Sequence, residues 1–250
     1  MNRKLFVSYQ NFLSLARKLV YVVLPGCRCI VCGAEAGDLP VCKKCAETYF
    51  SVKSVKDGLC AHCGKQLISE HQLCMSCRES SVLTHVDSVY PLFSYRLWAS
   101  SALCRWKLDG ERVFSMFFAG LLQKRLKELY ALKGDFVIVP VPPRPGKIRR
   151  TGWDQIDELS KILEKFYGFP FCRILERYSI IEQKCLDKTE RMESIGKSYG
   201  VKRNVSAVPE RICLLDDVLT TGATLESCAI KLKEAGAKEV FAVTLFTVDR

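Results

Sequence analysis

Two adjacent acids and a run of threonines mark one segment near the carboxyl end of the chain. The segment Ile212–Leu225 begins with four apolar residues, which predict a buried parallel strand, and Asp216 and Asp217 follow at its carboxyl end. Their carboxylates can accept hydrogen bonds from sugar hydroxyls. The amides of the next turn can wrap a phosphate at a helix N-terminus, where the helix dipole favours an anion. The residues of this turn are Leu219, Thr220, Thr221, Gly222, Ala223 and Thr224.

An ordinary turn between a strand and a helix is the simpler interpretation of this segment. It explains one threonine as a helix cap and one acid in the first helical turn. It does not explain two acids, three threonines and a glycine in this order. The order therefore predicts a site for a sugar phosphate.

Eight of the fourteen cysteines form four Cys-x-x-Cys pairs near the start of the chain. Each pair can point both sulfurs at one ion, and Gly33 and Gly64 allow the turn that follows. Four thiolates suit Zn²⁺, and short loops of this kind need metal for their folding energy. Disulfides are the alternative, but they are typical of short secreted chains without a large α/β portion. The predicted ligands are Cys29, Cys32, Cys42, Cys45, Cys60, Cys63, Cys74 and Cys77.

Each Cys-x-x-Cys pair forms a knuckle, and the sequence leaves open which two knuckles share one metal ion. Sequential pairing gives two zinc ribbons, whereas an interleaved pairing joins the first pair with the third and the second with the fourth. Four ligands close each site, so two structural zinc ions are expected rather than a catalytic one.

Charge and hydropathy restrict the partners. The chain has 38 Lys+Arg against 27 Asp+Glu, a net charge of +11, which favours phosphorylated molecules or nucleic acid. The basic residues are scattered along the chain, and an ordinary solvated basic surface explains them as well. No apolar run approaches the roughly 20 residues of a spanning helix, so we expect no stable membrane span and a cytoplasmic location. The segment Leu5–Val23 predicts an amphipathic helix that packs on its own protein.

Strand and helix signals alternate after residue 80, which predicts an α/β fold with a mainly parallel sheet flanked by helices. The predicted domains are an N-terminal helix over 1–24, a double zinc ribbon over 25–80 and the α/β domain over 81–250. The segment Ile180–Arg191 is polar and aperiodic, and predicts a loop. The predicted strands are Val86–Tyr95, Phe136–Val141, Arg211–Leu215 and Glu239–Thr247, and the predicted helices are Trp98–Trp106, Glu111–Leu129, Asp154–Tyr167 and Thr221–Ala235.

The segment Ile212–Leu225 resembles the motif with which type I phosphoribosyltransferases bind 5-phosphoribosyl-1-pyrophosphate (PRPP). The resemblance implies that Asp216 and Asp217 hold the ribose and that Thr220–Thr224 surround the 5-phosphate. It also implies Mg²⁺ held chiefly by the pyrophosphate, since this ion prefers oxygen ligands and water. Enzymes acting on 6-oxopurines typically place Asp where Thr220 stands, which disfavours purine salvage.

The whole chain resembles the ComF family, in which a double zinc ribbon precedes a type I phosphoribosyltransferase-like domain. The cysteine pairs and the PRPP motif carry the resemblance, together with Val139–Pro142, Arg149–Gln155 and Gln183–Leu186. The chain departs from the family at Asp154, where Asn is usual. The resemblance implies that the turn after Val141 holds pyrophosphate and that Gln183–Arg191 closes over the site. The implied pyrophosphate and loop residues are Pro142, Arg144, Arg149, Arg150 and Arg191, although each arginine can also be read as an exposed loop residue.

The resemblance implies a PRPP-binding protein of natural competence, which takes part in DNA uptake and handles incoming single-stranded DNA together with the uptake machinery. The alternative is an active phosphoribosyltransferase of nucleotide metabolism with an unknown acceptor base. Transfer from PRPP needs mainly orientation and electrostatics, and no acid–base residue stands out in the sequence.

Overall fold

The computed structural model describes residues 27–52, 54–55, 58–67, 72–79, 83–95, 97–178 and 198–248. The predicted helix Leu5–Val23 and the predicted loop Ile180–Arg191 lie outside these residues. The chain divides into two compact units, Met1–Tyr49 and Phe50–Arg250. The expected domain boundaries at residues 24/25 and 80/81 stay predictions.

The described part of the first unit is a short hairpin followed by a helix. Strand β1 (Cys27–Arg28) pairs antiparallel with β2 (Glu35–Gly37), and the turn between them carries Cys29 and Cys32. Helix α2 (Lys43–Tyr49) buries one side chain, that of Cys45. The cysteines thus occupy the positions at which these short elements approach one another.

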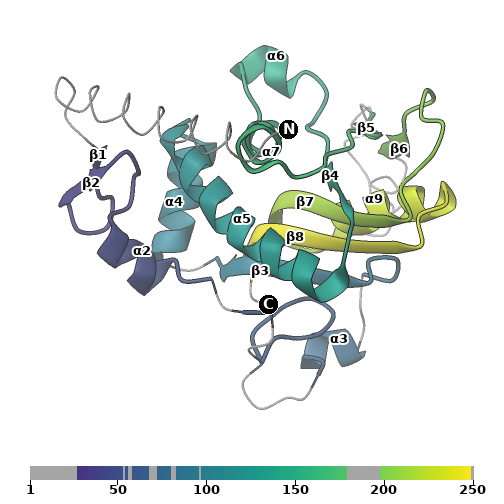
Figure 1. The fold of residues 1–250 in the computed structure, drawn as a ribbon, viewed down its shortest axis with the longest axis horizontal. Helices are drawn as coiled ribbons and strands as arrows, with labels where there is room; N and C mark the ends of the chain where they lie inside the picture. Colours follow the sequence, from purple (N-terminus) through teal and green to yellow (C-terminus); the bar gives the residue numbers. More distant parts are fainter. Residues whose placement is uncertain are drawn as a thin grey trace, which may run out of the picture. The chain divides into compact units, whose positions relative to one another are not determined.

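A four-stranded parallel sheet forms the centre of the second unit (Figure 1). The strand order is β3-β8-β7-β4, so the last two strands of the sequence lie in the middle. Parallel strands bring all their carboxyl ends to one edge of the sheet, which we call the carboxyl edge. The strands are β3 (Ser88–Ser94), β4 (Val137–Pro140), β7 (Arg211–Leu219) and β8 (Glu239–Thr247).

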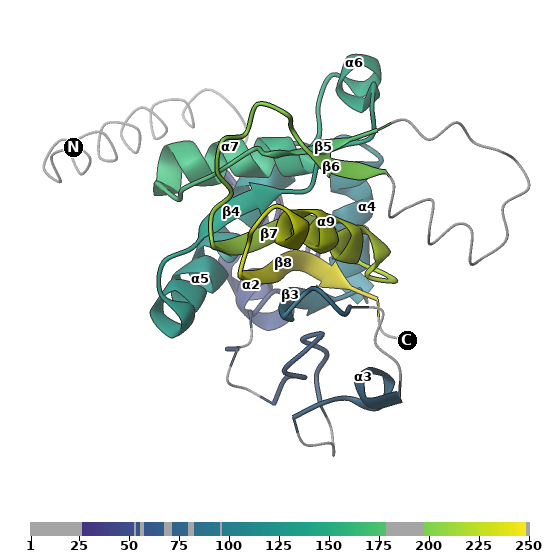
Figure 2. The same cartoon turned by 90° about the vertical axis from the view of Figure 1, so that its right-hand side faces the viewer.

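Helices cover both faces of this sheet (Figures 1 and 2), which confirms the predicted fold class. Helix α9 packs on β8 on one face, and α5 and α7 pack together on the other, beside α4. Each helix was predicted within four residues of its observed ends. The helices are α4 (Leu97–Lys107), α5 (Val113–Lys133), α7 (Gln155–Tyr167) and α9 (Ala223–Glu234).

The two faces of the sheet have different cores. Ile212 and Leu214 of β7 lie in a cluster of mostly aliphatic side chains with Leu225 of α9. Aromatic rings fill the α5 side, where the Phe118 and Phe246 rings lie 5.6 Å apart, edge to face. Trp106 is fully buried there. Burial of this kind supplies most of the stability of a domain and holds the carboxyl edge rigid.

Four short elements complete the description. Helix α3 (Met75–Glu79) follows the second cysteine group, and α6 (Lys147–Thr151) projects from the second unit (Figure 2). Strands β5 (Leu175–Arg177) and β6 (Tyr199–Val201) form a separate antiparallel pair. Among the described helices, none combines the length and the apolar character that crossing a bilayer requires.

Candidate functional site

The two acids of the predicted sugar site lie within β7. The strand was predicted to end at Leu215, but it continues to Leu219. The prediction was wrong because Val218 and Leu219 still pair with β8, opposite Phe246 and Thr247. Asp216 and Asp217 are therefore held by a paired backbone near the carboxyl edge.

The turn after β7 needs a glycine. Gly222 has φ 85° and ψ −10°, in the left-handed region that disfavours side chains. A Cβ at this position would also lie 2.8 Å from Cδ2 of Leu83. Helix α9 begins at Ala223, two residues later than predicted, because this left-handed residue precedes it. The exposed Thr220 and Thr221 thus stand directly before the first amides of a helix, where an anion is favoured.

A lysine from another element neutralises part of this acidic pair. Nζ of Lys107, in the last turn of α4, lies 2.6 Å from Oδ2 of Asp217. The backbone N–H of Asp217 donates to Oδ1 of Asp216 over 2.8 Å. Burial raises the pKa of Asp216 to about 8, and the neighbouring charge of Asp217 adds to the rise. The edge therefore pairs an acid that holds its proton near neutral pH with an acid that faces a cation.

Further polar contacts connect Lys107 to the Arg149–Gln155 segment. Nε2 of Gln155 donates to the backbone carbonyl of Lys107 over 3.2 Å. Nζ of Lys147 lies 2.6 Å from Oδ2 of Asp154 and also contacts the Gln155 side chain. Sequence analysis missed the two lysines, because their acidic partners lie in other elements and no local spacing marks them.

The family departure at Asp154 has a structural account. The Asp154 side chain caps the N-terminus of α7, and its Oδ1 accepts the amides of Ile156 and Asp157 at 3.0 Å each. Asp and Asn are about equally good at this position. Asp in place of the usual Asn therefore preserves the start of the helix.

The implied pyrophosphate residues fall into three groups. Pro142 and Arg144 follow β4, whose neighbour Val141 donates its amide to the Leu215 carbonyl over 3.0 Å. The start of this turn therefore lies beside β7, next to Asp216. Arg149 and Arg150 are exposed on the projecting helix α6 (Figure 2), and Arg191 lies outside the described residues. The roles of these arginines at the site stay predictions.

The eight cysteines form two groups of four, which resolves the pairing left open by the sequence. Pairing is sequential, because the four sulfurs of Cys29–Cys45 lie within 4.8 Å of one another and those of Cys60–Cys77 do likewise. Sulfurs of Cys32 and Cys42 are 3.8 Å apart, and those of Cys63 and Cys74 are 3.7 Å apart. A Zn–S distance of about 2.3 Å gives a tetrahedron edge of about 3.8 Å. Both groups therefore fit a tetrahedral metal ion, and none of these cysteines forms a disulfide.

A second layer of contacts supports the Cys60–Cys77 group. The backbone amide of Cys74 donates to Sγ of Cys60 over 3.4 Å, which favours the thiolate form of the ligand. Nε2 of His62 lies 2.8 Å from the carbonyl oxygen of Leu83. His62 is therefore occupied outside the metal group, as expected when four cysteines are already present.

No family model matches the chain. Three curated competence proteins do match over most of it. Competence protein ComFC of Streptococcus pneumoniae is 28% identical over 207 residues, covering 81% of this chain and 86% of the relative. Competence protein F of Haemophilus influenzae is 27% identical and covers 85% and 93%. ComFC of Bacillus subtilis is 29% identical and covers 83% and 84%.

Solved structures align only weakly. An allosteric regulatory enzyme of purine biosynthesis aligns with TM-score 0.32 and 20% identity, over 49% of this chain and 25% of its own. A phosphoribosylpyrophosphate synthetase from Mycobacterium smegmatis aligns with TM-score 0.31 and 22% identity, over 52% and 33%.

The parallel sheet, its helical cover and the two cysteine groups define an α/β protein with two four-cysteine groups of the zinc-ribbon kind. The curated relatives confirm the resemblance stated from the sequence. The chain is similar to ComF-type competence proteins over most of their length.

Proposed function

We propose that this protein binds PRPP as its magnesium complex at the carboxyl edge of the sheet. One observation carries the proposal: two acids in the second half of the buried central strand β7 precede, by two residues, a turn of threonines and glycine that opens a helix. Asp216 and Asp217 would accept the ribose hydroxyls, and the turn Thr220–Thr224 would surround the 5-phosphate. Mg²⁺ would be held chiefly by the pyrophosphate, which this ion prefers to an all-protein cage.

The two cysteine groups would hold structural Zn²⁺. Their sulfur spacing suits the ion, and each group is closed by four ligands. Metal analysis of the purified protein should give about two zinc ions per chain. A value near one would mean that one group stays empty.

Calorimetry tests the PRPP site directly. Titration of the protein with PRPP in excess Mg²⁺ should give a binding isotherm, and the double variant Asp216→Ala/Asp217→Ala should lose it. Asp135→Ala is a matched control, because this exposed acid precedes β4 at the opposite edge of the sheet. No heat at millimolar PRPP with the unaltered protein would refute the proposal.

The biological role proposed here is natural competence, in a cytoplasmic step that handles incoming single-stranded DNA together with the uptake machinery. The names of the curated relatives and the net charge of +11 support it. Fluorescence anisotropy with a labelled single strand should show binding that weakens steeply as salt rises, because phosphate contacts release counterions. The absence of a shift at low salt would count against direct DNA contact.

Phosphoribosyl transfer is the second candidate. The turn after β4 begins beside the carboxyl edge, where a leaving pyrophosphate could be held. An enzyme would release pyrophosphate when PRPP and the correct acceptor base are present together, whereas a binding protein would not. A coupled pyrophosphate assay over a panel of bases separates the two.

A further inference from the structure

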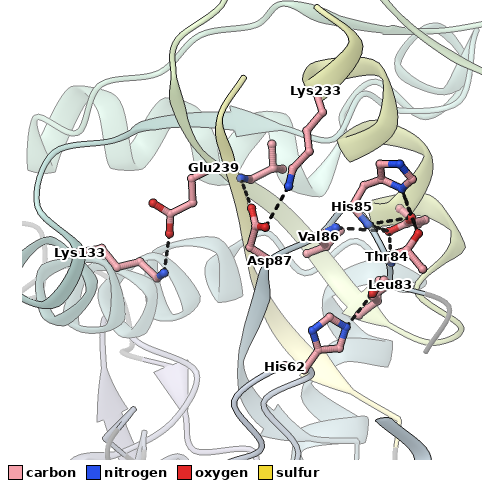
Figure 3. A network of polar contacts seen from close by, with 11 residues as sticks. His62, Leu83, Thr84, His85, Val86, Asp87, Lys133, Lys233 and Glu239 are labelled. Carbon is pink, nitrogen blue, oxygen red and sulfur yellow. Dashed lines mark hydrogen bonds and ion pairs between the residues drawn. The ribbon is translucent and has the colours of Figure 1, made fainter. Parts of the chain in front are cut away.

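A short segment joins the second cysteine group to the start of α9. We call residues 83–87 the strap (Figure 3). The Glu226 carboxylate accepts the backbone amides of Thr84 at 2.9 Å and His85 at 3.0 Å. It also accepts the Thr84 hydroxyl and lies 2.6 Å from Nδ1 of His85. Glu226 is buried in the first turn of α9, four residues after Gly222. The strap is therefore fixed to the helix that follows the turn Thr220–Thr224, which we call the phosphate turn.

The same strap contacts the knuckle of the second cysteine group. Nε2 of His62, between Cys60 and Cys63, lies 2.8 Å from the Leu83 carbonyl oxygen (Figure 3). The carbonyl of His62 accepts the amide of Val89 in β3 over 2.7 Å. A Cβ on Gly64 would lie 2.3 Å from Cδ of Pro91, so the knuckle backbone rests directly on β3. The knuckle therefore has a fixed position against both the strap and the sheet.

Leu83 connects the two contacts. Its carbonyl faces the knuckle, while its buried side chain lies against Gly222, where an added Cβ would come within 2.8 Å of Cδ2. Leu219 and Leu225, on either side of the phosphate turn, belong to the same buried cluster. Close-packed interiors transmit displacement because they have few voids. A shift of the knuckle would therefore reach the turn through one residue.

We propose that Leu83 and Glu226 are positioning residues through which the metal-loaded Cys60–Cys77 group orders the phosphate turn. The inference rests on the proposed function, since it assigns this turn to the 5-phosphate of PRPP. Metal in the second cysteine group and PRPP in the turn then bind cooperatively. Coupling is reciprocal, so each ligand must raise the affinity for the other by the same factor. The first cysteine group belongs to the other compact unit.

The two cysteine groups provide a matched comparison. Calorimetry with Mg²⁺ and PRPP should show affinity falling roughly tenfold in Cys74→Ser/Cys77→Ser, within the usual range of coupling between sites. Cys42→Ser/Cys45→Ser should stay within about twofold of the unaltered protein. Zinc content and thermal unfolding are measured on every variant. Equal losses in both double variants, or no loss in either, would overturn the inference.

A single substitution keeps the inference testable if the cysteine variants do not fold. Leu83→Ala keeps every cysteine, so it should retain both zinc ions and still bind PRPP more weakly, by several fold. Leu132→Ala is the control, because this leucine is exposed on α5. In the reciprocal assay, PRPP should slow the release of one of the two zinc ions to a chromogenic chelator in the unaltered protein but not in Leu83→Ala.

The outcomes separate the inference from the function on which it rests. If the unaltered protein does not bind PRPP, the proposed function fails. If it binds PRPP but Leu83→Ala binds equally well and zinc release ignores PRPP, the inference alone fails.

Discussion

One fully buried tyrosine and one half-buried tyrosine should respond oppositely to the same substitution. The Tyr199 side chain is 1% exposed, and its hydroxyl has no hydrogen-bond partner in the described part of the chain. Thr224 lies beside it without reaching hydrogen-bonding geometry, and burial raises the pKa of Tyr199 to about 12. The Tyr130 hydroxyl, in contrast, donates to the Phe136 carbonyl over 2.7 Å. Tyr199→Phe would thus remove an unsatisfied hydroxyl, whereas Tyr130→Phe would remove a hydrogen bond.

The magnitudes follow from the cost of buried polar groups. An unsatisfied buried hydroxyl costs roughly 1–3 kcal/mol, so Tyr199→Phe should stabilise the protein by about 1 kcal/mol. Tyr130→Phe should destabilise it by about 1 kcal/mol, since a net hydrogen bond is worth about that much. In a unit of this size, roughly 1 kcal/mol shifts the melting temperature by about 2–4 °C. The two variants should therefore melt about 4–8 °C apart.

Urea and thermal unfolding measure this difference. Tryptophan fluorescence reports the unit that contains both tyrosines, because all three tryptophans of the chain lie in it. Both variants must be compared with the unaltered protein under one buffer condition and without ligand. If Tyr199→Phe loses as much stability as Tyr130→Phe, the Tyr199 hydroxyl has a partner and the reasoning is refuted.

Three further predictions concern the carboxyl edge. Burial and then Asp217 raise the pKa of Asp216 to about 8, so PRPP affinity should increase as pH rises from 6 to 9 and ionises this acceptor; a dependence that persists in Asp216→Asn would contradict it. Asp154→Ala should destabilise the protein by about 1 kcal/mol or more, because it removes both the α7 cap and the ion pair with Lys147, whereas Asp154→Asn keeps the cap and should lose less, as urea unfolding will show. Lys107→Met should weaken PRPP roughly tenfold, or about 1.4 kcal/mol, by removing the counter-charge of Asp217, while Lys161→Met on exposed α7 surface leaves calorimetric affinity unchanged.

Local patterns made much of this structure predictable. The spacing of apolar residues predicted the strands of the sheet and the helices that cover it, because each element buries one or both of its faces. The cysteine spacing fixed the knuckles for the same local reason, since two sulfurs on one turn must face one ion. Whether sequential or interleaved knuckles share an ion depends on the path of the chain between them, and only the structure decided it.

Contacts between distant segments were not predictable. Lys107 and Asp217 are separated by 110 positions, and neither residue carries a local sign of the other. Strands β5 and β6 have three residues each, too few for a periodic signal, and they pair only because the fold brings them together. The extension of β7 through its two acids likewise depended on the partner strand, because acidic residues are poor strand formers by themselves.

The charge of the carboxyl edge explains why a divalent cation belongs to the proposed ligand. Three acids, Asp154, Asp216 and Asp217, face two lysines, Lys107 and Lys147. PRPP adds several negative charges, and like charges about 4 Å apart repel by roughly 4 kcal/mol at an effective dielectric constant near 20. In the free site the proton on Asp216 relieves this repulsion, and in the complex Mg²⁺ would take over that role. Binding of the magnesium complex should therefore release a proton, which calorimetry in buffers of different ionisation enthalpy detects.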